Sequence, residues 1–208
     1  MPRLLQGAAL TLGLSVAAIV LSVLIGSAAT VARVSGGRLL GALVGAYISF
    51  IRGTPLLVQI LLIFYLLPSL GLNLPPVAAG IIALGVNSGA FMTEIMRGGV
   101  AAIPPGQYEA AHALGLSRRV IWRKVVFPQM FQLITPPLVN EFTMVIKLTP
   151  LVSVITVVEM MRMAQQMYNA NFRVMEVLLA AAILYFVIIF SLSQFAGWLE
   201  RRNITKFS

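Results

Sequence analysis

The feature that most constrains this sequence is a long apolar run near its amino terminus that contains no charged residue. The run extends from about Leu4 to Ala32, with Arg3 just before it. A helix needs about 20 apolar residues to cross a hydrocarbon core about 30 Å thick, so this run can span a bilayer. A secretory signal peptide is the alternative, but its apolar core is normally about 7–15 residues long. We therefore predict a membrane-spanning helix here.

Composition extends this prediction to the whole chain. Of the 208 residues, 59% are hydrophobic and 10% are charged, and the mean hydropathy is +0.95. Soluble domains carry about 25% charged residues, so this chain has too few charges to cover a surface facing water. We predict an all-α integral membrane protein, one transmembrane domain over residues 1–208. Its five predicted spans cover residues 4–32, 39–67, 77–100, 131–148 and 177–199, and a polar loop covers 101–129.

Proline and glycine mark breaks within these spans. Arg52-Gly53-Thr54-Pro55 divides the second span, and we expect its membrane portion to begin near Pro55. Pro136-Pro137 softens the fourth span near its start. The amphipathic segment 149–176 predicts a short helix packed at the far membrane surface.

Basic residues are unevenly distributed between the two sides of the predicted spans. If the amino terminus lies outside, eleven basic residues fall in inside loops and three in outside segments. Cytoplasmic loops are enriched in Lys and Arg, so we predict that the carboxyl terminus and the 101–129 loop are cytoplasmic. This bias also explains the net charge of +9 without a nucleic-acid partner. The inside residues are Arg33, Arg38, Arg52, Arg97, Arg118, Arg119, Arg123, Lys124, Arg201, Arg202 and Lys206; the outside residues are Arg3, Arg162 and Arg173.

The residues that catalysis would need are missing from the sequence. None of the three lysines, at positions 124, 147 and 206, follows the glycine of a GxxxxGK[ST] phosphate-binding loop, so we do not expect this chain to hydrolyse ATP. His112 is the only histidine and there is no cysteine, which argues against a buried nucleophile and a metal site. We predict no enzymatic activity, no metal and no cofactor in this chain, and a solvent-facing or partner-facing His112.

The polar loop is expected to contain two short helices. A Pro-Pro pair ends the third span, and residues Gly106 to Leu114 then form a helix whose Ala and Leu side chains face a partner. Gly115 is a natural left-handed terminator for this helix. Ser117 should cap a second helix, which we expect to end before Pro128.

Three blocks of the sequence carry a resemblance to a known family. In the loop, Glu109-Ala110-Ala111 is followed by Gly115 and later by Pro128. This pattern closely resembles the EAA loop of permease subunits of type I ABC importers. The blocks Ile51–Gln59 and Asn140-Glu141-Phe142 resemble the polar amino-acid subfamily, which includes histidine, arginine, glutamine and glutamate permeases. The resemblance covers nearly the whole chain, and the three blocks in this order are highly specific.

This resemblance implies a permease subunit of an ATP-driven importer of polar amino acids in the bacterial inner membrane. The helix of Glu109, Ala110 and Ala111, ended by Gly115, would be the coupling helix that lies across a groove of a cytoplasmic ABC ATPase dimer, where ATP and Mg²⁺ bind. A second permease, identical or homologous, would complete the pathway, and an extracytoplasmic binding protein would deliver the amino acid. The chain departs from the family pattern after Lys147, which leaves its path around Pro150 open.

Polar side chains within the spans are candidates for substrate contact, because a charge within a bilayer is costly. Glu141 lies midway along the fourth span and has no basic neighbour within a helical turn. We predict that its carboxylate meets a substrate ammonium or guanidinium group. Asn87 and Ser88 lie midway along the third span and are candidates for the same site, with hydrogen bonds between helices as the alternative.

Two further charged residues are expected to have structural roles. Glu94 lies three residues before Arg97, so the two can pair on one helix face near the cytoplasmic interface. Lys147 is near the outer end of its span and is expected to extend its amine toward the interface. Whether either touches substrate is left open by the sequence.

A secondary transporter or a channel that works without an ATPase is the main alternative function. It would have to couple its ions through these few carboxylates. A membrane enzyme is a more distant alternative, since the residues for hydrolysis are absent. A neighbouring gene for an ATPase and another for a secreted binding protein would favour the importer.

Overall fold

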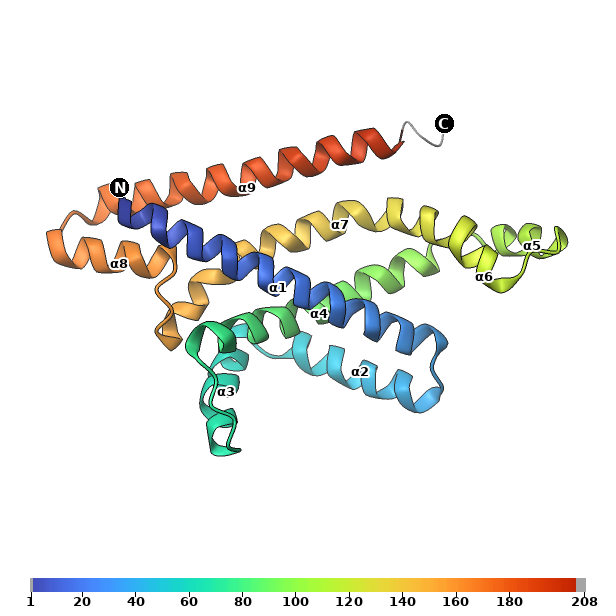
Figure 1. The fold of residues 1–208 in the computed structure, drawn as a ribbon, viewed down its shortest axis with the longest axis horizontal. Helices are drawn as coiled ribbons and strands as arrows, with labels where there is room; N and C mark the ends of the chain where they lie inside the picture. The colour runs from blue at the N-terminus through green and yellow to red at the C-terminus, as the bar shows by residue number, and fades with distance from the viewer. Residues whose placement is uncertain (1, 205–208) are drawn as a thin grey trace.

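The structure, a computed structural model, describes the backbone of residues 2–204 and the side chains of residues 2–198. Within this part all the elements are helical (Figure 1). They are α1 (Pro2–Ser35), α2 (Arg38–Gly53), α3 (Leu56–Ser69), α4 (Pro76–Ala101), α5 (Pro105–Ala113), α6 (Arg118–Ile121), the π-helical turn η1 (Trp122–Val126), α7 (Phe127–Leu148), the 3₁₀ segment η2 (Thr149–Ile155), α8 (Met160–Asn171) and α9 (Val174–Ile204). Of the basic residues counted for orientation, Arg201 and Arg202 lie in α9 beyond the described side chains, and Lys206 lies outside the described residues.

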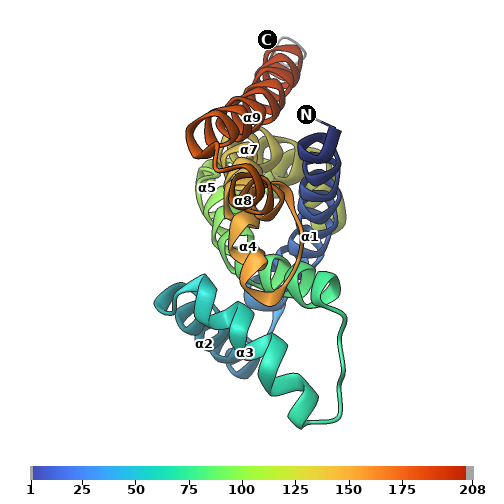
Figure 2. The same ribbon diagram turned by 90° about the vertical axis from the view of Figure 1, so that its left-hand side faces the viewer.

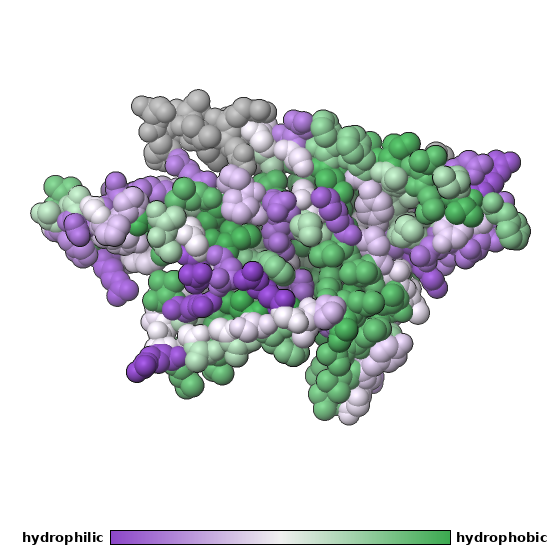
Figure 3. Space-filling model, turned by 180° about the vertical axis from the view of Figure 1, so that it is seen from behind, coloured by the Kyte–Doolittle hydropathy of each residue, from purple (hydrophilic) through white to green (hydrophobic). Residues whose placement is uncertain are grey.

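Among the described residues, four helical segments are long and apolar enough to cross a membrane, at residues 2–35, 76–101, 118–155 and 174–198. The pair α2 and α3 would add a fifth span, which is broken between the two helices. The prediction of an all-α membrane protein with about five spans is therefore confirmed. Figure 3 shows hydrophobic residues over the middle of the molecule and along the protruding α3, with many hydrophilic residues toward the two ends.

The most extensive helix–helix contact joins α1 to α4. Gly26 of α1 lies so close to α4 that an added Cβ would be 2.5 Å from the Cβ of Met92. Gly85 of α4 is equally close to α1, because an added Cβ would lie 2.7 Å from Cδ2 of Leu21. Small residues let helices approach closely in a membrane, where packing rather than hydrophobic exclusion drives association. These glycines therefore set the distance between the two helices.

The polar loop is packed onto the spans by its own buried side chains. One hydrophobic cluster joins the last turns of α4 to α5, α6, η1 and the first half of α7. A second cluster joins α1, α3, α4 and η2. The loop members of the first cluster are Ile103, Ala111, Ile121 and Val126, and its span members are Met92, Met96, Met130, Ile134 and Leu138. The loop is thus a fixed extension of α4 and α7.

The second predicted span, residues 39–67, is strongly bent in the structure. The break falls at residues 52–55 as expected, but α2 and α3 are two helices that meet at 109°. Thr54 is extended, with φ −122° and ψ 145°, as a residue before proline tends to be, and Pro55 has no N–H to continue the helix of α2. Figure 2 shows the pair on one side of the bundle, with α9 on the opposite side.

Two expectations for the loop are wrong. The second loop helix does not end before Pro128, because α6, η1 and α7 follow one another without a break. In η1 the Phe127 N–H bonds to the carbonyl of Trp122, five residues back, and this wider turn accommodates the proline ring at the start of α7. Ser117 does occupy the position before α6, but its hydroxyl makes no capping hydrogen bond.

Beyond α7 lies the 3₁₀ segment η2, which begins with Thr149-Pro150. Thr156, the residue that follows η2, has a left-handed backbone with a φ of 68°. The short helix predicted within residues 149–176 is α8. Its first turn is capped by Glu159, whose carboxylate accepts from the backbone N–H groups of Met161 and Arg162 at 2.9 and 2.7 Å. The Tyr185 hydroxyl of α9 donates to the same carboxylate at 3.0 Å. Glu159, which our sequence analysis did not single out, thus ties α8 to α9.

We predict that Gly26→Ala destabilises the protein by about 1–3 kcal/mol, because the added methyl overlaps Met92 and forces α1 and α4 apart. Gly13→Ala on the same helix is the matched control, since an added Cβ there has nothing within 4 Å. Thermal unfolding of both variants in detergent measures the effect. Equal melting temperatures would show that the α1–α4 contact does not limit stability.

Candidate functional site

A carboxylate and a hydroxyl predicted as substrate contacts lie together between α4 and α7. The Ser88 hydroxyl donates a hydrogen bond to Oε1 of Glu141, with an O–O distance of 2.8 Å. Ser88 is buried, whereas Glu141 is only partly buried. A carboxylate has two oxygens and about four acceptor positions, so one serine leaves most of its capacity unused. Among the described residues no cation pairs with Glu141, and the salt bridges involve Glu94 instead.

Asn87, the third predicted contact, is not joined to this pair. Its side-chain amide donates to Oε1 of Gln59 in α3, at 2.9 Å. The Gln59 amide in turn donates to the carbonyl oxygens of Ile51 and Thr54, at 2.8 and 3.1 Å, and to the Thr54 hydroxyl at 2.9 Å. Gln59 therefore satisfies carbonyls that the end of α2 leaves without helical partners. Asn87 holds the bend between α2 and α3, and its hydrogen bond between helices is the alternative that the sequence left open.

Glu94 pairs with Arg97 as the sequence predicts, and also with a residue that the sequence did not identify. Its Oε2 lies 2.9 Å from Nη2 of Arg97, and its Oε1 lies 2.6 Å from Nη1 of Arg33 at the end of α1. No spacing rule could find Arg33, because it lies 61 residues away in sequence. The cluster joins the last turns of α1 and α4, and both sides of the ion pairs are only partly exposed, which fits the structural role expected for Glu94.

Lys147 is exposed near the end of α7, six residues after Glu141 in the sequence. Exposure fits the expectation that its amine extends to the interface. Within the part of the chain that the structure describes, no group of three or more His, Cys, Asp or Glu side chains could hold a metal ion.

The Ser88–Glu141 pair can bind a ligand electrostatically. A half-buried carboxylate with spare acceptor positions binds cationic groups and N–H donors.

The helix with the Glu-Ala-Ala sequence, α5, ends with the backbone geometry that Gly115 was expected to provide. Gly115 has a φ of +69°. Its N–H bonds to the carbonyl of His112 at 2.9 Å, and the N–H of Leu116 bonds to the carbonyl of Ala111 at 3.2 Å. These two bonds form a Schellman motif, in which a left-handed residue closes the helix.

The side chains of α5 divide into two sets. Ala111 is buried in the cluster that joins the loop to the spans, so it faces the rest of this chain. Glu109, Ala110 and His112 are exposed, and Leu114, which follows the helix, is 77% exposed. A large apolar side chain this exposed at the tip of a packed loop is available to a partner. The expectation that Ala and Leu face a partner thus fits Leu114 and Ala110 but is wrong for Ala111.

Comparison with known proteins gives the following matches. The family model described as "Binding-protein-dependent transport system inner membrane component" matches residues 18–205. The glutamine transport system permease protein GlnP of Escherichia coli is 39% identical over 203 residues, which cover 97% of this chain and 93% of that protein. The L-cystine transport system permease protein TcyB of Bacillus subtilis is 36% identical over 202 residues, covering 97% and 86%.

Solved structures match the fold over the same length. A crystal structure of an amino acid ABC transporter with histidines has a TM-score of 0.90 and 37% sequence identity, and the match covers 97% of this chain and 94% of that one. The MetNI methionine ABC transporter in an inward-facing conformation has a TM-score of 0.81 at 16% identity, covering 98% and 97%. At that identity the second likeness concerns the fold alone.

We predict that Gln59→Met loosens the bend between α2 and α3. Methionine keeps the length but removes the donors to three acceptors, and it leaves the buried Asn87 amide unpaired, which costs about 1–3 kcal/mol. Gln166→Met is the control, since Gln166 is exposed on α8.

Because the chain has no cysteine, two introduced cysteines can carry spin labels in α1 and at the tip of α3. Gln59→Met should lower the melting temperature and broaden the distance distribution between the labels, and Gln166→Met should change neither. An unchanged, narrow distribution in Gln59→Met would contradict a role for Gln59 in fixing the bend.

Proposed function

The chain belongs to the family of binding-protein-dependent transport system inner membrane components, and on this premise we propose that it is the permease subunit of an ATP-driven importer of polar amino acids. The relatives named for glutamine, arginine and L-cystine transport support the substrate class. The amino acid ABC transporter with a TM-score of 0.90 supports the same architecture. The observation that carries the proposal is the coverage of these matches, which extend over 97% of the chain.

In this proposal the chain does not hydrolyse ATP. The lack of a GxxxxGK[ST] loop supports a division of labour, with ATP and Mg²⁺ bound by a separate cytoplasmic ATPase dimer. A second permease, either another copy of this chain or a homologue, completes the pathway. An extracytoplasmic amino-acid-binding protein delivers the substrate, as the family description implies.

We propose that the amino terminus lies outside and that α5 and α6 lie on the cytoplasmic side of the inner membrane. The end of the bundle that carries α5 and α6 also carries the turn between α1 and α2 (Figure 1). That end therefore gathers Arg33, Arg38, Arg118, Arg119 and Arg123. Such a concentration of Arg supports a cytoplasmic location under the positive-inside rule.

The exposed side chains of α5 are proposed to be the contact with the ATPase. Glu109, Ala110 and Leu114 would lie against the partner, while Ala111 transmits displacement of the helix to the spans through the cluster in which it is buried. Gly115 keeps this helix short and fixes its direction relative to α6. A short helix with a fixed end, on a loop that is packed against the spans, can transmit a rigid-body motion to α4 and α7.

For the substrate, we propose that Glu141 meets the cationic part of the amino acid, with Ser88 holding the carboxylate in place. The partial exposure of Glu141, its position midway along α7 and its lack of a described ion pair support this role. A carboxylate without a role in a bilayer would cost about 2.5–3.5 kcal/mol on insertion scales. Asn87 would act indirectly, by keeping α3 in position beside α4.

We predict that Glu141→Gln lowers the affinity for a cationic or ammonium-bearing substrate by roughly 1.5–3 kcal/mol, or about ten- to a hundredfold. Glutamine keeps an oxygen that can accept from Ser88, so folding should be preserved. Uptake into proteoliposomes should therefore fall steeply while the melting temperature and basal ATPase activity of the complex persist.

Glu176→Gln is the control for loss of a carboxylate, since Glu176 is exposed at the start of α9. A Glu141 with only a structural role would instead reveal itself as a lower melting temperature with normal uptake by the surviving complex. Normal stability together with normal uptake would contradict both roles.

We predict that Gly115→Val uncouples ATP hydrolysis from transport or weakens assembly with the ATPase. A β-branched residue at a φ of +69° is strained by about 1–2 kcal/mol or more, and the strain acts at the end of α5. Gly106→Val is a matched control, because an added Cβ meets no atom within 4 Å at either glycine but only Gly115 has a positive φ. Co-purification and coupled uptake should be impaired in Gly115→Val alone; impairment of both variants alike would contradict the argument from φ.

A further inference from the structure

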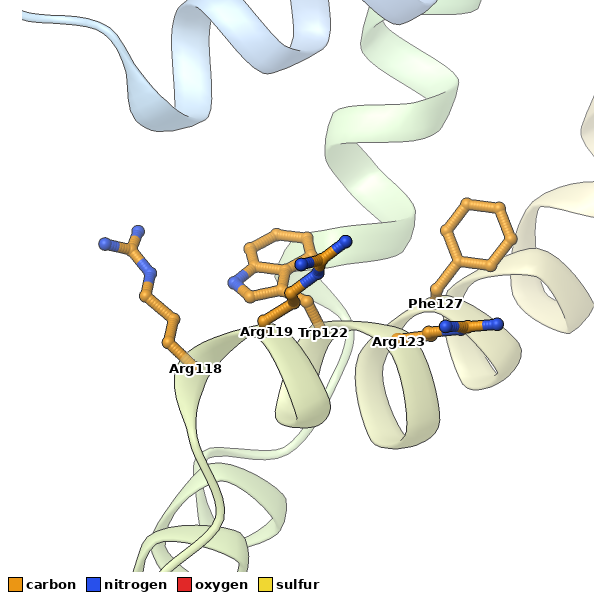
Figure 4. Close-up of a pocket in the computed structure, with 5 residues that line it drawn as sticks. All are labelled: Arg118, Arg119, Trp122, Arg123 and Phe127. Carbon is orange, nitrogen blue, oxygen red and sulfur yellow. The ribbon is translucent and has the colours of Figure 1, made fainter.

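A hollow lined by cationic and aromatic side chains lies beside the junction of α6, η1 and α7. It has a volume of about 760 Å³ and is open to the outside. Its lining residues are Arg118, Arg119, Trp122, Arg123 and Phe127. Figure 4 shows these side chains following one another along one side of the helix, with Arg118 at one end and Phe127 at the other.

The hollow follows the π-helical turn η1. In a regular α-helix the Phe127 N–H would bond to the carbonyl of Arg123, four residues earlier. In η1 it bonds instead to the carbonyl of Trp122, five residues earlier, so this turn holds one extra residue. Single π-helical turns within α-helices are frequent at functional sites.

The three arginines of the hollow have no carboxylate to neutralise them within the described part of the chain. The ion pairs there join Glu94 to Arg33 and Arg97, and the neighbouring Lys124 only adds to the positive charge. Figure 4 shows their guanidinium groups spread along the hollow, and each planar guanidinium fork matches the oxygens of a phosphate. The ligand chemistry is therefore that of a phosphate group.

The apolar end of the hollow points to the source of that phosphate. Phe127 is 55% exposed and stacks on Phe131, with ring centroids 6.3 Å apart. Phe131 is itself exposed, and the helix continues from there as the segment able to cross the membrane. Over about three turns of helix the surface thus changes from Arg118 to exposed phenylalanine rings. A free phosphate ion would contact only the arginines, whereas the acyl chains of a phospholipid would also contact the phenylalanine rings.

We propose that this hollow binds the headgroup of an anionic phospholipid, with the phosphate held by Arg118, Arg119 and Arg123 and the acyl chains lying along Phe127 and Phe131. Trp122 lies at the level of the headgroup, where its ring is partly buried and partly wet. The site begins three residues after Gly115, so a bound lipid would stiffen the support of α5. The ATPase activity of the assembled transporter should therefore depend on the anionic lipid content of the membrane. The binding itself requires only that the chain lies in a membrane, independently of what it transports.

The test uses the complete transporter in nanodiscs of phosphatidylcholine with increasing phosphatidylglycerol. The charge variant is Arg119→Gln with Arg123→Gln, and the aromatic variant is Trp122→Leu. Arg38→Gln is the matched control, because Arg38 is an exposed arginine at the same end of the bundle but outside the hollow. Lipid retained by each purified complex is counted by native mass spectrometry, and ATPase activity is measured against the phosphatidylglycerol fraction.

We expect each lost arginine to weaken phosphatidylglycerol retention about fivefold, the effect of one basic residue near an anionic surface. Arg38→Gln should retain lipid as the wild-type chain does, and the activity of the charge variant should respond less to phosphatidylglycerol. Equal retention in the charge variant and the control would overturn the proposal.

Two other outcomes would identify a different ligand and would also overturn it. If excess inorganic phosphate displaces the retained lipid as effectively in Trp122→Leu as in wild type, the hollow is a site for a soluble anion. If the charge variant keeps its lipid but loses the ATPase subunit on purification, the arginines contact a protein partner. Because lipid retention is read without transport, a failure of the proposed import function would leave this result unchanged.

Discussion

Where α1 crosses α4, glycines bring the two backbones so near that side chains larger than hydrogen do not fit without movement. This close contact defines how α4 is rotated, and α4 carries polar groups that bond to three other helices. Ser88 is turned toward α7 and Glu141, while the adjacent Asn87 is turned toward α3 and Gln59. About two turns further along, Glu94 pairs with Arg33 of α1. The polar features of three different helix pairs thus depend on the placement of a single helix.

Each of these polar groups has a partner suited to a low-dielectric surrounding. In the described residues, no buried side-chain nitrogen or oxygen lacks a hydrogen bond. Gln59 and Glu159 are almost completely buried, and both are used where a helix ends and leaves backbone groups without helical partners. In a bilayer such groups have no water to bond with, so the buried side chains make the bend after α2 and the start of α8 possible. Glu141 differs because its single hydrogen bond leaves acceptor positions free.

Several elements could be predicted from the sequence because their causes are local. The apolar runs indicated the spans, and the Arg-Gly-Thr-Pro block indicated where the second span breaks. Gly115 indicated a left-handed helix end, which the structure confirms with a φ of +69°. The expected helix end before Pro128 was wrong, because the π-helical turn η1 joins α6 to α7 and the helix passes Pro128 without a break. Ile121 before the turn and Val126 at its end pack against the spans, and no local sequence pattern indicates this long-range packing.

By itself, the sequence determined that this chain is a helical membrane protein with a polar loop of the Glu-Ala-Ala type and a few polar residues inside its spans. Each of these conclusions rests on hydropathy, on local backbone preferences or on short motifs, all of which act between near neighbours. Only the tertiary structure decided which polar residues meet. Ser88 and Glu141 are 53 residues apart, and Arg33 and Glu94 are 61 residues apart. Such pairs form because close packing fixes how each helix is rotated, and that rotation depends on contacts with all of its neighbours at once.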